Sequence, residues 1–240
     1  MPVYETRLVR RETVAEGTMA FHLEKPPGWR HEAGQNLTLT LPDPPETDGA
    51  GNARTFTIAS APHEPELMVA TRMRDTAFKR VLKTAAIGTS LTVDGPNGVM
   101  VLHEAADRAA VFLAGGIGIT PFLSMTRHAT HQRLPHRLYL LYSSRRPEDA
   151  AFLEELRALE QANPNYRLVA TMAEPGKSSL PWQGETGFIR RELLERHLPD
   201  LRSPVYYLAG PPAMTAAMQA MLKDIGLPED AVRSEEFYGY

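Results

Sequence analysis

A change of pattern near residue 105 constrains the fold of this 240-residue chain more than any other feature. Before it, short apolar or alternating runs are separated by glycine and proline turns, a pattern typical of antiparallel strands. After it, apolar runs alternate with helical segments, which is typical of a parallel sheet covered on both faces. We therefore predict two domains: an antiparallel β-barrel over residues 1–104 and a parallel-sheet α/β domain over residues 105–240.

The same patterns place the expected elements. In the first domain, one helix is predicted at 76–86 and strands at 3–14, 18–24, 36–41, 54–59, 67–73 and 90–93. A turn at 94–98 is expected after the last strand. In the second domain, helices are predicted at 119–131, 147–162, 190–197 and 211–225, and strands at 110–114, 137–142, 166–171 and 205–209.

Composition excludes several kinds of chemistry. The sequence has no cysteine, which excludes disulfides, iron–sulfur clusters and thiol nucleophiles from this chain. A formal net charge of −3 argues against general nucleic-acid binding, which is typical of basic proteins. No apolar run reaches the ~20 residues that span a bilayer, and the first residues lack the apolar core of a secretory signal. We expect a cytoplasmic protein with no membrane span.

The strongest local motif is a glycine-rich segment, Gly115-Gly116-Ile117-Gly118-Ile119-Thr120-Pro121. It directly follows a predicted strand and opens a predicted helix. Glycines let a backbone approach a pyrophosphate closely, and a helix N-terminus offers free N–H groups. Thr120 is expected to cap the helix and Pro121 to occupy its first turn. The segment predicts nucleotide binding; the alternative is a tight turn with no ligand.

Two further motifs stand in register with the glycine-rich segment. One is Arg54-Thr55-Phe56-Thr57, and the other is Tyr206-Tyr207-Leu208-Ala209-Gly210-Pro211-Pro212-Ala213-Met214. In addition, Pro121 stands where the ordinary dinucleotide fingerprint has its third glycine. Together these features resemble the ferredoxin–NADP⁺ reductase family over essentially the whole chain. The resemblance implies a reductase that holds FAD, takes a hydride from NAD(P)H and passes electrons to a separate acceptor.

The resemblance implies roles for the first motif, all of whose residues, Thr55 included, are expected at the flavin. Arg54 would pair with the FAD pyrophosphate, because a guanidinium offers a planar fork of donors. Phe56 would pack on the isoalloxazine in place of the family's tyrosine, and the Thr57 hydroxyl would hydrogen-bond flavin N5. A second diphosphate contact is expected around the start of the helix at residue 76, with simple helix capping as the alternative. Its expected residues are Arg72, Met73, Thr76, Ala77 and Phe78.

The end of the chain completes the predicted reacting centre. Related reductases place an aromatic residue over the flavin, with an acid two residues before it. Glu235 with Phe237 fits this spacing and is preferred, and Glu236 with Tyr238 is the alternative. These rings could instead only pin the C-terminus to the core. The predicted catalytic residues are Thr57, Thr120, Glu235 and Phe237.

Other residues bear on the nicotinamide nucleotide. Ala209 replaces a cysteine that many family members place near the nicotinamide, and Gly210 and Pro211 are expected contacts beside it. Ser144, Arg145 and Arg146 follow the second parallel strand and offer groups that suit a 2′-phosphate. Acids follow at 148 and 149, and an acid near this position suits the free ribose of NADH. We expect NADPH, with NADH as the alternative.

Charged residues suggest how an acceptor could dock. The segment 72–83 carries five basic residues against the single acid Asp75. Lys79 and Lys83 are expected to share an exposed helix face and to steer an acidic electron carrier, with a solvated helix face as the alternative. The acceptor would be a ferredoxin, a flavodoxin or an oxygenase component.

Two histidines of the helix predicted at 119–131, His128 and His131, have a spacing that can ligate a metal. No further motif supports a metal site, and no metal is predicted.

Two alternatives to a reductase with bound flavin stay open. One is a flavin-binding subunit without turnover, and the other is an enzyme that releases reduced flavin.

Overall fold

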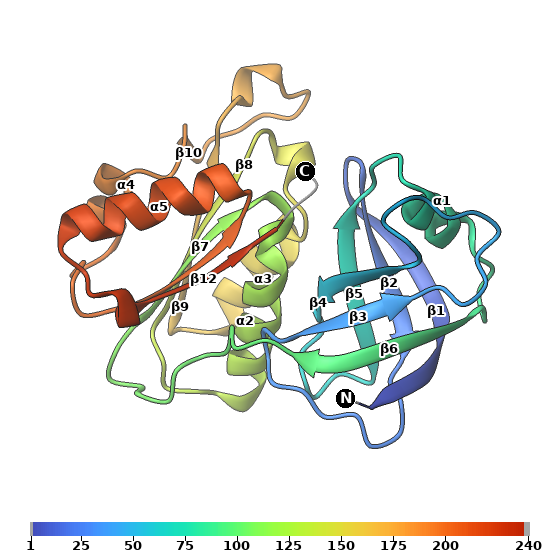
Figure 1. Cartoon of the computed structure of the whole chain (residues 1–240). Coiled ribbons are helices and arrows are strands. Elements are labelled where there is room, and N and C mark those ends of the chain that lie inside the picture. Colours follow the sequence, from blue (N-terminus) through green and yellow to red (C-terminus); the bar gives the residue numbers. More distant parts are fainter. Residues whose placement is uncertain (1, 238–240) are drawn as a thin grey trace.

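In the computed structural model, which describes residues 2–237, an antiparallel and a parallel sheet lie side by side (Figure 1). The antiparallel sheet has six strands in the order β4-β3-β6-β1-β2-β5. They are β1 (Val3–Ala15), β2 (Thr18–Glu24), β3 (Asn36–Thr40), β4 (Ala53–Thr57), β5 (Glu66–Arg72) and β6 (Ser90–Asn97). The two ends of the order meet just after β4, where the Ala59 N–H donates to the Met68 carbonyl at 2.7 Å. The sheet therefore curls into the predicted barrel.

Alternating side chains build the barrel core. Leu37 and Leu39 of β3 are fully buried while their strand neighbours are half-buried, the period-two pattern of a sheet with one face inside. The helix α1 (Ala77–Thr84) covers one end of the barrel and buries Phe78 and Leu82 in the same core. It begins one residue later than predicted, since the Thr76 side chain caps it by accepting from the Lys79 N–H.

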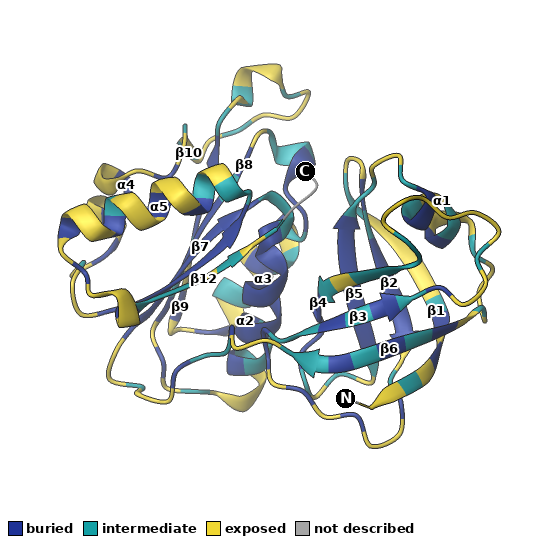
Figure 2. Cartoon of the chain, in the orientation of Figure 1, coloured by how far each residue is buried: buried dark blue, intermediate teal, exposed yellow. Residues whose placement is uncertain are grey.

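The second sheet is parallel, in the order β10-β9-β8-β7-β11-β12. Its strands are β7 (Ala110–Gly115), β8 (Leu138–Ser144), β9 (Tyr166–Met172), β10 (Glu185–Thr186), β11 (Val205–Gly210) and β12 (Val232–Glu236). Its helices are α2 (Thr120–Gln132), α3 (Leu153–Ala162), α4 (Arg191–His197) and α5 (Pro212–Ile225). In β7, Phe112 packs in the cluster that includes α2 and α3, whereas Val111 and Leu113 pack in the cluster of α4 and α5. The central strands are buried on both faces, as Figure 2 shows.

Two predicted features are wrong, and the strand β12 was not predicted. The helix predicted over 147–162 is a short 3₁₀ turn at Pro147–Asp149 followed by α3, because Phe152 has φ 62° and interrupts the helix. The predicted turn at 94–98 lies mostly within β6, where a register shift opposite β3 accommodates the glycine–proline pair as a bulge. The polar strand β12 was missed because an edge strand needs no apolar pattern.

The two sheets share buried surface through α2. Ala20, Ala59 and Ala70 of the barrel belong to the same buried cluster as Phe122 and Met125 of α2. The predicted domain boundary falls in the segment 98–109, which contains neither helix nor strand and links the sheets; the exact boundary stays a prediction. Within residues 2–237, no helix combines the length and apolar character needed to cross a bilayer.

Candidate functional site

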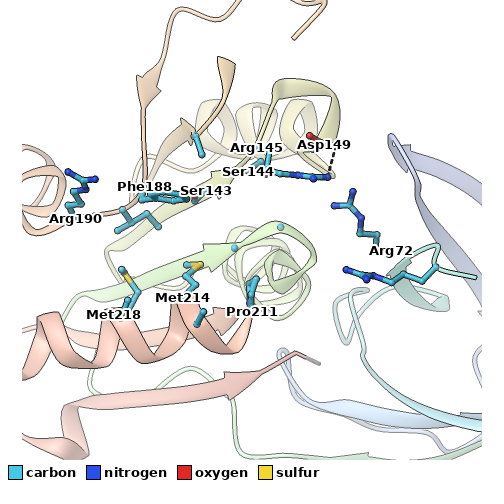
Figure 3. A pocket seen from close by; sticks show the side chains of 17 residues that line it. Arg72, Ser143, Ser144, Arg145, Asp149, Phe188, Arg190, Pro211, Met214 and Met218 are labelled. Carbon is cyan, nitrogen blue, oxygen red and sulfur yellow. Dashed lines mark ion pairs between the residues drawn. The ribbon is translucent and has the colours of Figure 1, made fainter. Parts of the chain in front are cut away.

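A cavity of about 830 Å³ lies where β7, β8, β9 and β11 end (Figure 3). This carboxyl edge is where open parallel sheets bind ligands. The cavity brings together six predicted residues from both domains: Arg72, Gly115, Gly116, Ser144, Arg145 and Pro211. Figure 3 shows Arg72, which comes from the barrel, at the same end of the cavity as Arg145, with Arg190 at the opposite end. The first domain thus contributes to a site centred on the second.

The glycines of the predicted loop have different tasks. Gly116 has φ +52° and lines the cavity, so it suits close approach of a ligand to the backbone. Gly118 is buried, and a Cβ placed there would lie 2.3 Å from the Ala209 carbonyl oxygen. Gly118 therefore serves the packing of the loop against β11.

We expect Gly118→Ala to lower the free energy of unfolding by about 3 kcal/mol, because the added methyl meets backbone atoms that cannot move aside. Urea unfolding would measure the change. Gly176→Ala is the matched control, since a Cβ at Gly176 meets nothing within 4 Å. Equal stability of the two variants would contradict the packing role.

Thr120 does not cap the helix as predicted. A 3₁₀ turn at Gly116–Ile119 precedes α2, the cap position is Ile119, and the Thr120 hydroxyl donates to the Ile117 carbonyl at 3.1 Å. Pro121 lies in the first turn of α2, as predicted. Both Thr120 and Ala209 are buried, so their predicted contacts with cofactor or substrate stay predictions.

The charged residues after β8 divide into two groups. Arg145 is exposed and lines the cavity, with a 3.7 Å ion pair to Asp149. Arg146 instead pairs with Asp149 at 2.9 Å and with Glu16 of the barrel at 3.0 Å. The Glu148 carboxylate accepts from Ser178 and Ser179 in hydrogen bonds of 2.7–2.9 Å. Both acids that could favour NADH are therefore already paired.

Several cavity residues were missed by the sequence reasoning. Phe188 is 66% exposed and faces the cavity together with Arg190, and Met214 and Met218 of α5 line the opposite side. Phe188 and Arg190 follow the two-residue strand β10, which was not predicted. The signal that could have found them is their place in the connection after a parallel strand, where the ligand edge of the sheet lies.

The flavin motif lies on β4, with Arg54 and Phe56 on one face. The Phe56 ring lies 6.0 Å from the Phe78 ring, and the Arg54 guanidinium lies 5.1 Å from it. This arrangement is expected, since residues two apart in a strand share a face. Phe78 itself belongs to the barrel core. Met73 lies against the same core, and its N–H donates to the Gly17 carbonyl.

An acidic side chain joins Arg54 to the start of α1. Asp48 accepts from the Ala77 N–H at 3.0 Å with one oxygen and pairs with Arg54 at 3.3 Å with the other. These donors, with the Ala50 N–H, hold the pKa of Asp48 below its usual value. The two predicted diphosphate contacts thus lie close enough to share one anion.

A second group of polar residues joins β4 to the end of the chain. Thr57 lies opposite Asn36 in the pairing of β3 with β4, and the Asn36 amide donates to Glu235 at 3.2 Å. The Thr57 hydroxyl and the second oxygen of Glu235 are buried and have no hydrogen-bond partner in the part of the chain that is described. Buried polar atoms ordinarily have a hydrogen-bond partner, so the polar atoms of a ligand would fit at Thr57 and Glu235.

Phe237 follows Glu235 closely and packs against the cluster between the domains, while its N–H donates to the Gly210 carbonyl at 3.0 Å. It thus lies beside the loop after β11. The alternative aromatic, Tyr238, lies outside the described residues.

Comparison with known proteins adds the family. A family model described as "Oxidoreductase NAD-binding domain" matches residues 112–220. The chain is 30% identical over 233 residues to the glycine betaine monooxygenase reductase subunit of Chromohalobacter salexigens, covering 95% of this chain and 62% of that protein. It is 28% identical over 236 residues to ferredoxin–NADP reductase B of Sorangium cellulosum, covering 97% of this chain and 92% of that protein. These matches confirm the resemblance of the chain to ferredoxin–NADP⁺ reductases and to related reductase subunits.

A solved structure shows the same fold as this chain. The ferredoxin NADP⁺ reductase of Neisseria gonorrhoeae with bound FAD and NADP matches with a TM-score of 0.81 and 21% identity, covering 98% of both chains. The likeness confirms the predicted fold class of a barrel followed by a parallel sheet. The chain spans 62% of the length of the Chromohalobacter relative.

The predicted basic docking face on α1 needs correction. Lys79 is only half-exposed, and its ammonium donates to the Arg72 carbonyl at 2.7 Å. Arg80 forms ion pairs with Glu46 and Asp75. Lys83 is exposed, but the expected cluster of free cations on α1 is not present among the described residues.

The paired histidines of α2 have a structural partner. The His131 ring stacks on His63 of the barrel at 3.7 Å, and the His128 ring lies 6.4 Å from His63. Within residues 2–237, no group of three or more potential ligands is arranged to hold a metal ion.

Proposed function

We propose that this chain is an FAD-dependent oxidoreductase that takes a hydride from NADPH and passes electrons to a separate acceptor. The observation that carries the proposal is the buried Thr57 hydroxyl, which has no partner among residues 2–237 and lies three residues from an Arg54 already paired with an acid. A buried hydroxyl without a partner costs stability unless a ligand supplies one. FAD supplies hydride acceptance and release of electrons one at a time when bound.

The residues present suit FAD on the barrel side. Arg54 and the first N–H groups of α1 would hold the diphosphate in place of Asp48. Phe56 offers a partly buried ring beside Thr57 for the flavin plane. Family relatives whose names or titles include ferredoxin–NADP reductase and bound FAD support this assignment.

The charge balance of the cavity favours NADPH over NADH. Among the described residues, its lining includes the cations Arg72, Arg74, Arg145 and Arg190 and one acid, Asp149. Hydrogen bonds from Arg146 hold the pKa of Asp149 below its usual value. A 2′-phosphate gains charge-assisted hydrogen bonds in such a site. The exposed Phe188 ring in the same cavity suits stacking of the adenine.

Arg145→Ala is expected to raise the KM for NADPH about tenfold and to leave the KM for NADH nearly unchanged, because only NADPH carries the 2′-phosphate. Steady-state kinetics with both nucleotides would measure this. Arg191→Ala is the control, since Arg191 is exposed and pairs with Glu195 on α4. A wild-type preference for NADH would overturn the 2′-phosphate assignment.

The acceptor is proposed to be a ferredoxin, a flavodoxin or an oxygenase component, because relatives are named as a monooxygenase reductase subunit and a ferredoxin–NADP reductase. The deciding experiment is anaerobic addition of NADPH and NADH to the purified protein, followed by a screen of one-electron acceptors. Bleaching of the flavin colour is expected. A yellow protein that neither nucleotide bleaches would indicate a flavin-binding subunit without turnover.

A further inference from the structure

The contact between Asn36 and Glu235 joins parts of the chain that are 199 residues apart. Asn36 lies on β3 of the barrel, and Glu235 lies on the edge strand β12, opposite Ala209 of β11. The hydrogen bond therefore links the strand pair that carries Thr57 to the neighbour of β11, the strand that Pro211 of the cavity lining follows. No motif in the sequence pointed to Asn36.

The surroundings of Asn36 leave its side chain little freedom. A Cβ placed at Gly98 would come within 2.8 Å of the Asn36 amide nitrogen, so this glycine makes room for the amide. Asn36 and Thr57 lie directly opposite each other, and paired residues of an antiparallel ladder project to the same face. The Asn36 amide thus emerges on the side of the sheet that carries the Thr57 hydroxyl.

Glu235 uses one carboxyl oxygen to accept from Asn36, and its other oxygen, Oε2, is buried without a partner among the described residues. Two influences act on its pKa: burial raises it, and the hydrogen bond from Asn36 lowers it. A buried carboxyl with one free oxygen can take up or release a proton there.

We propose that Asn36 is a positioning residue, which holds the Glu235 carboxyl beside the Thr57 strand pair and leaves Oε2 free to carry a proton. The inference rests on the proposed function. Oxidation of NADPH to NADP⁺ yields two electrons and one proton, and the acceptor takes only the electrons. The proton must therefore leave the site, and Oε2 is a buried base that can receive it.

The first test uses the flavin-free protein and does not depend on turnover. A carboxyl whose pKa is raised on folding stabilises the folded state less as the pH rises through that pKa. Asn36→Leu removes the donor, raises the folded-state pKa further and should widen the fall in urea midpoint between pH 5 and pH 8. In a Glu235→Gln background, Asn36→Leu should shift the urea midpoint by the same amount at pH 5 and at pH 8. If Asn36→Leu also shifts the two midpoints by the same amount when Glu235 is present, the proposal is overturned.

The second test uses the flavin-loaded protein. The rate of NADPH-driven ferricyanide reduction should depend on pH through the Glu235 carboxyl. The midpoint of this pH profile should rise by about one unit in Asn36→Leu, because one hydrogen bond to the carboxylate is lost. Thr38→Val is the matched control: it removes the 3.2 Å bond between Thr38 and Thr55 on the same two strands. An unmoved profile, or the same movement in Thr38→Val, would reject the positioning role. Failure of wild-type protein to bleach with NADPH would instead reject the proposed function, while the first test would still stand.

Discussion

Arg54→Ala is expected to weaken FAD binding by about 2 to 3 kcal/mol, roughly 30- to 150-fold in Kd, because the diphosphate loses a two-pronged charged donor. Fluorescence titration of the flavin-free protein with FAD would measure the loss. Riboflavin has no phosphate, so its weaker binding should be unchanged. Arg7→Ala removes an exposed arginine of the same barrel and serves as the control. Full FAD affinity in Arg54→Ala would remove the basis for the flavin assignment.

A companion variant should act in the opposite direction. Asp48 occupies the donors that the diphosphate needs, so FAD must displace it from Arg54 and Ala77. Asp48→Asn removes the competing charge and should tighten FAD binding without changing riboflavin binding. Asp43→Asn makes the same charge change at an exposed position of the same loop. Weaker FAD binding in Asp48→Asn would show that Asp48 supports the site rather than competing for it.

Thr57→Val is expected to separate catalysis from stability. Valine keeps the shape of threonine but removes the buried hydroxyl, which has no partner in the described part of the chain. The free energy of unfolding of the flavin-free protein should stay the same or rise by up to about 1 kcal/mol, because an unsatisfied group is lost. Flavin reduction by NADPH should slow by about 10- to 100-fold, as for the loss of one oriented donor. Stopped-flow absorbance and urea unfolding would measure the two effects.

Thr13→Val is the control for that experiment, because it makes the same change at an exposed threonine on β1 of the same barrel. Slowing in both variants would point to a general disturbance of the barrel. A normal rate in Thr57→Val would exclude the hydroxyl from the reaction.

The sequence predicted the elements whose signal is local. The glycine-rich segment, the buried strand before it and the helix after it combine turn chemistry with apolar patterning, and all three were found close to their predicted places. Asn36 and Phe188 could not be found in this way. Their roles depend on contacts with residues remote in sequence or on a two-residue strand, and neither leaves a periodic pattern.

Charge was the least reliable guide, because a residue's sign does not show what already neutralises it. Arg145 and Arg146 are adjacent in the sequence, yet one lines the cavity and the other is held by Asp149 and Glu16. The basic segment before and within α1 likewise loses most of its free charge to Glu46, Asp75 and the Arg72 carbonyl. Only the three-dimensional arrangement shows which cations remain for a ligand.

The buried cluster that joins the barrel to α2 limits how the molecule can work. Ala20, Ala59 and Ala70 would meet water if the two halves swung apart, as would Phe122 and Met125. A hinge motion that separates the domains would therefore expose this apolar cluster to water, which costs free energy. The two domains should unfold in one cooperative transition. A fragment that ends near residue 104 would expose an apolar surface. We therefore expect a nucleotide to reach the cavity, where Phe188 is exposed, without separation of the domains.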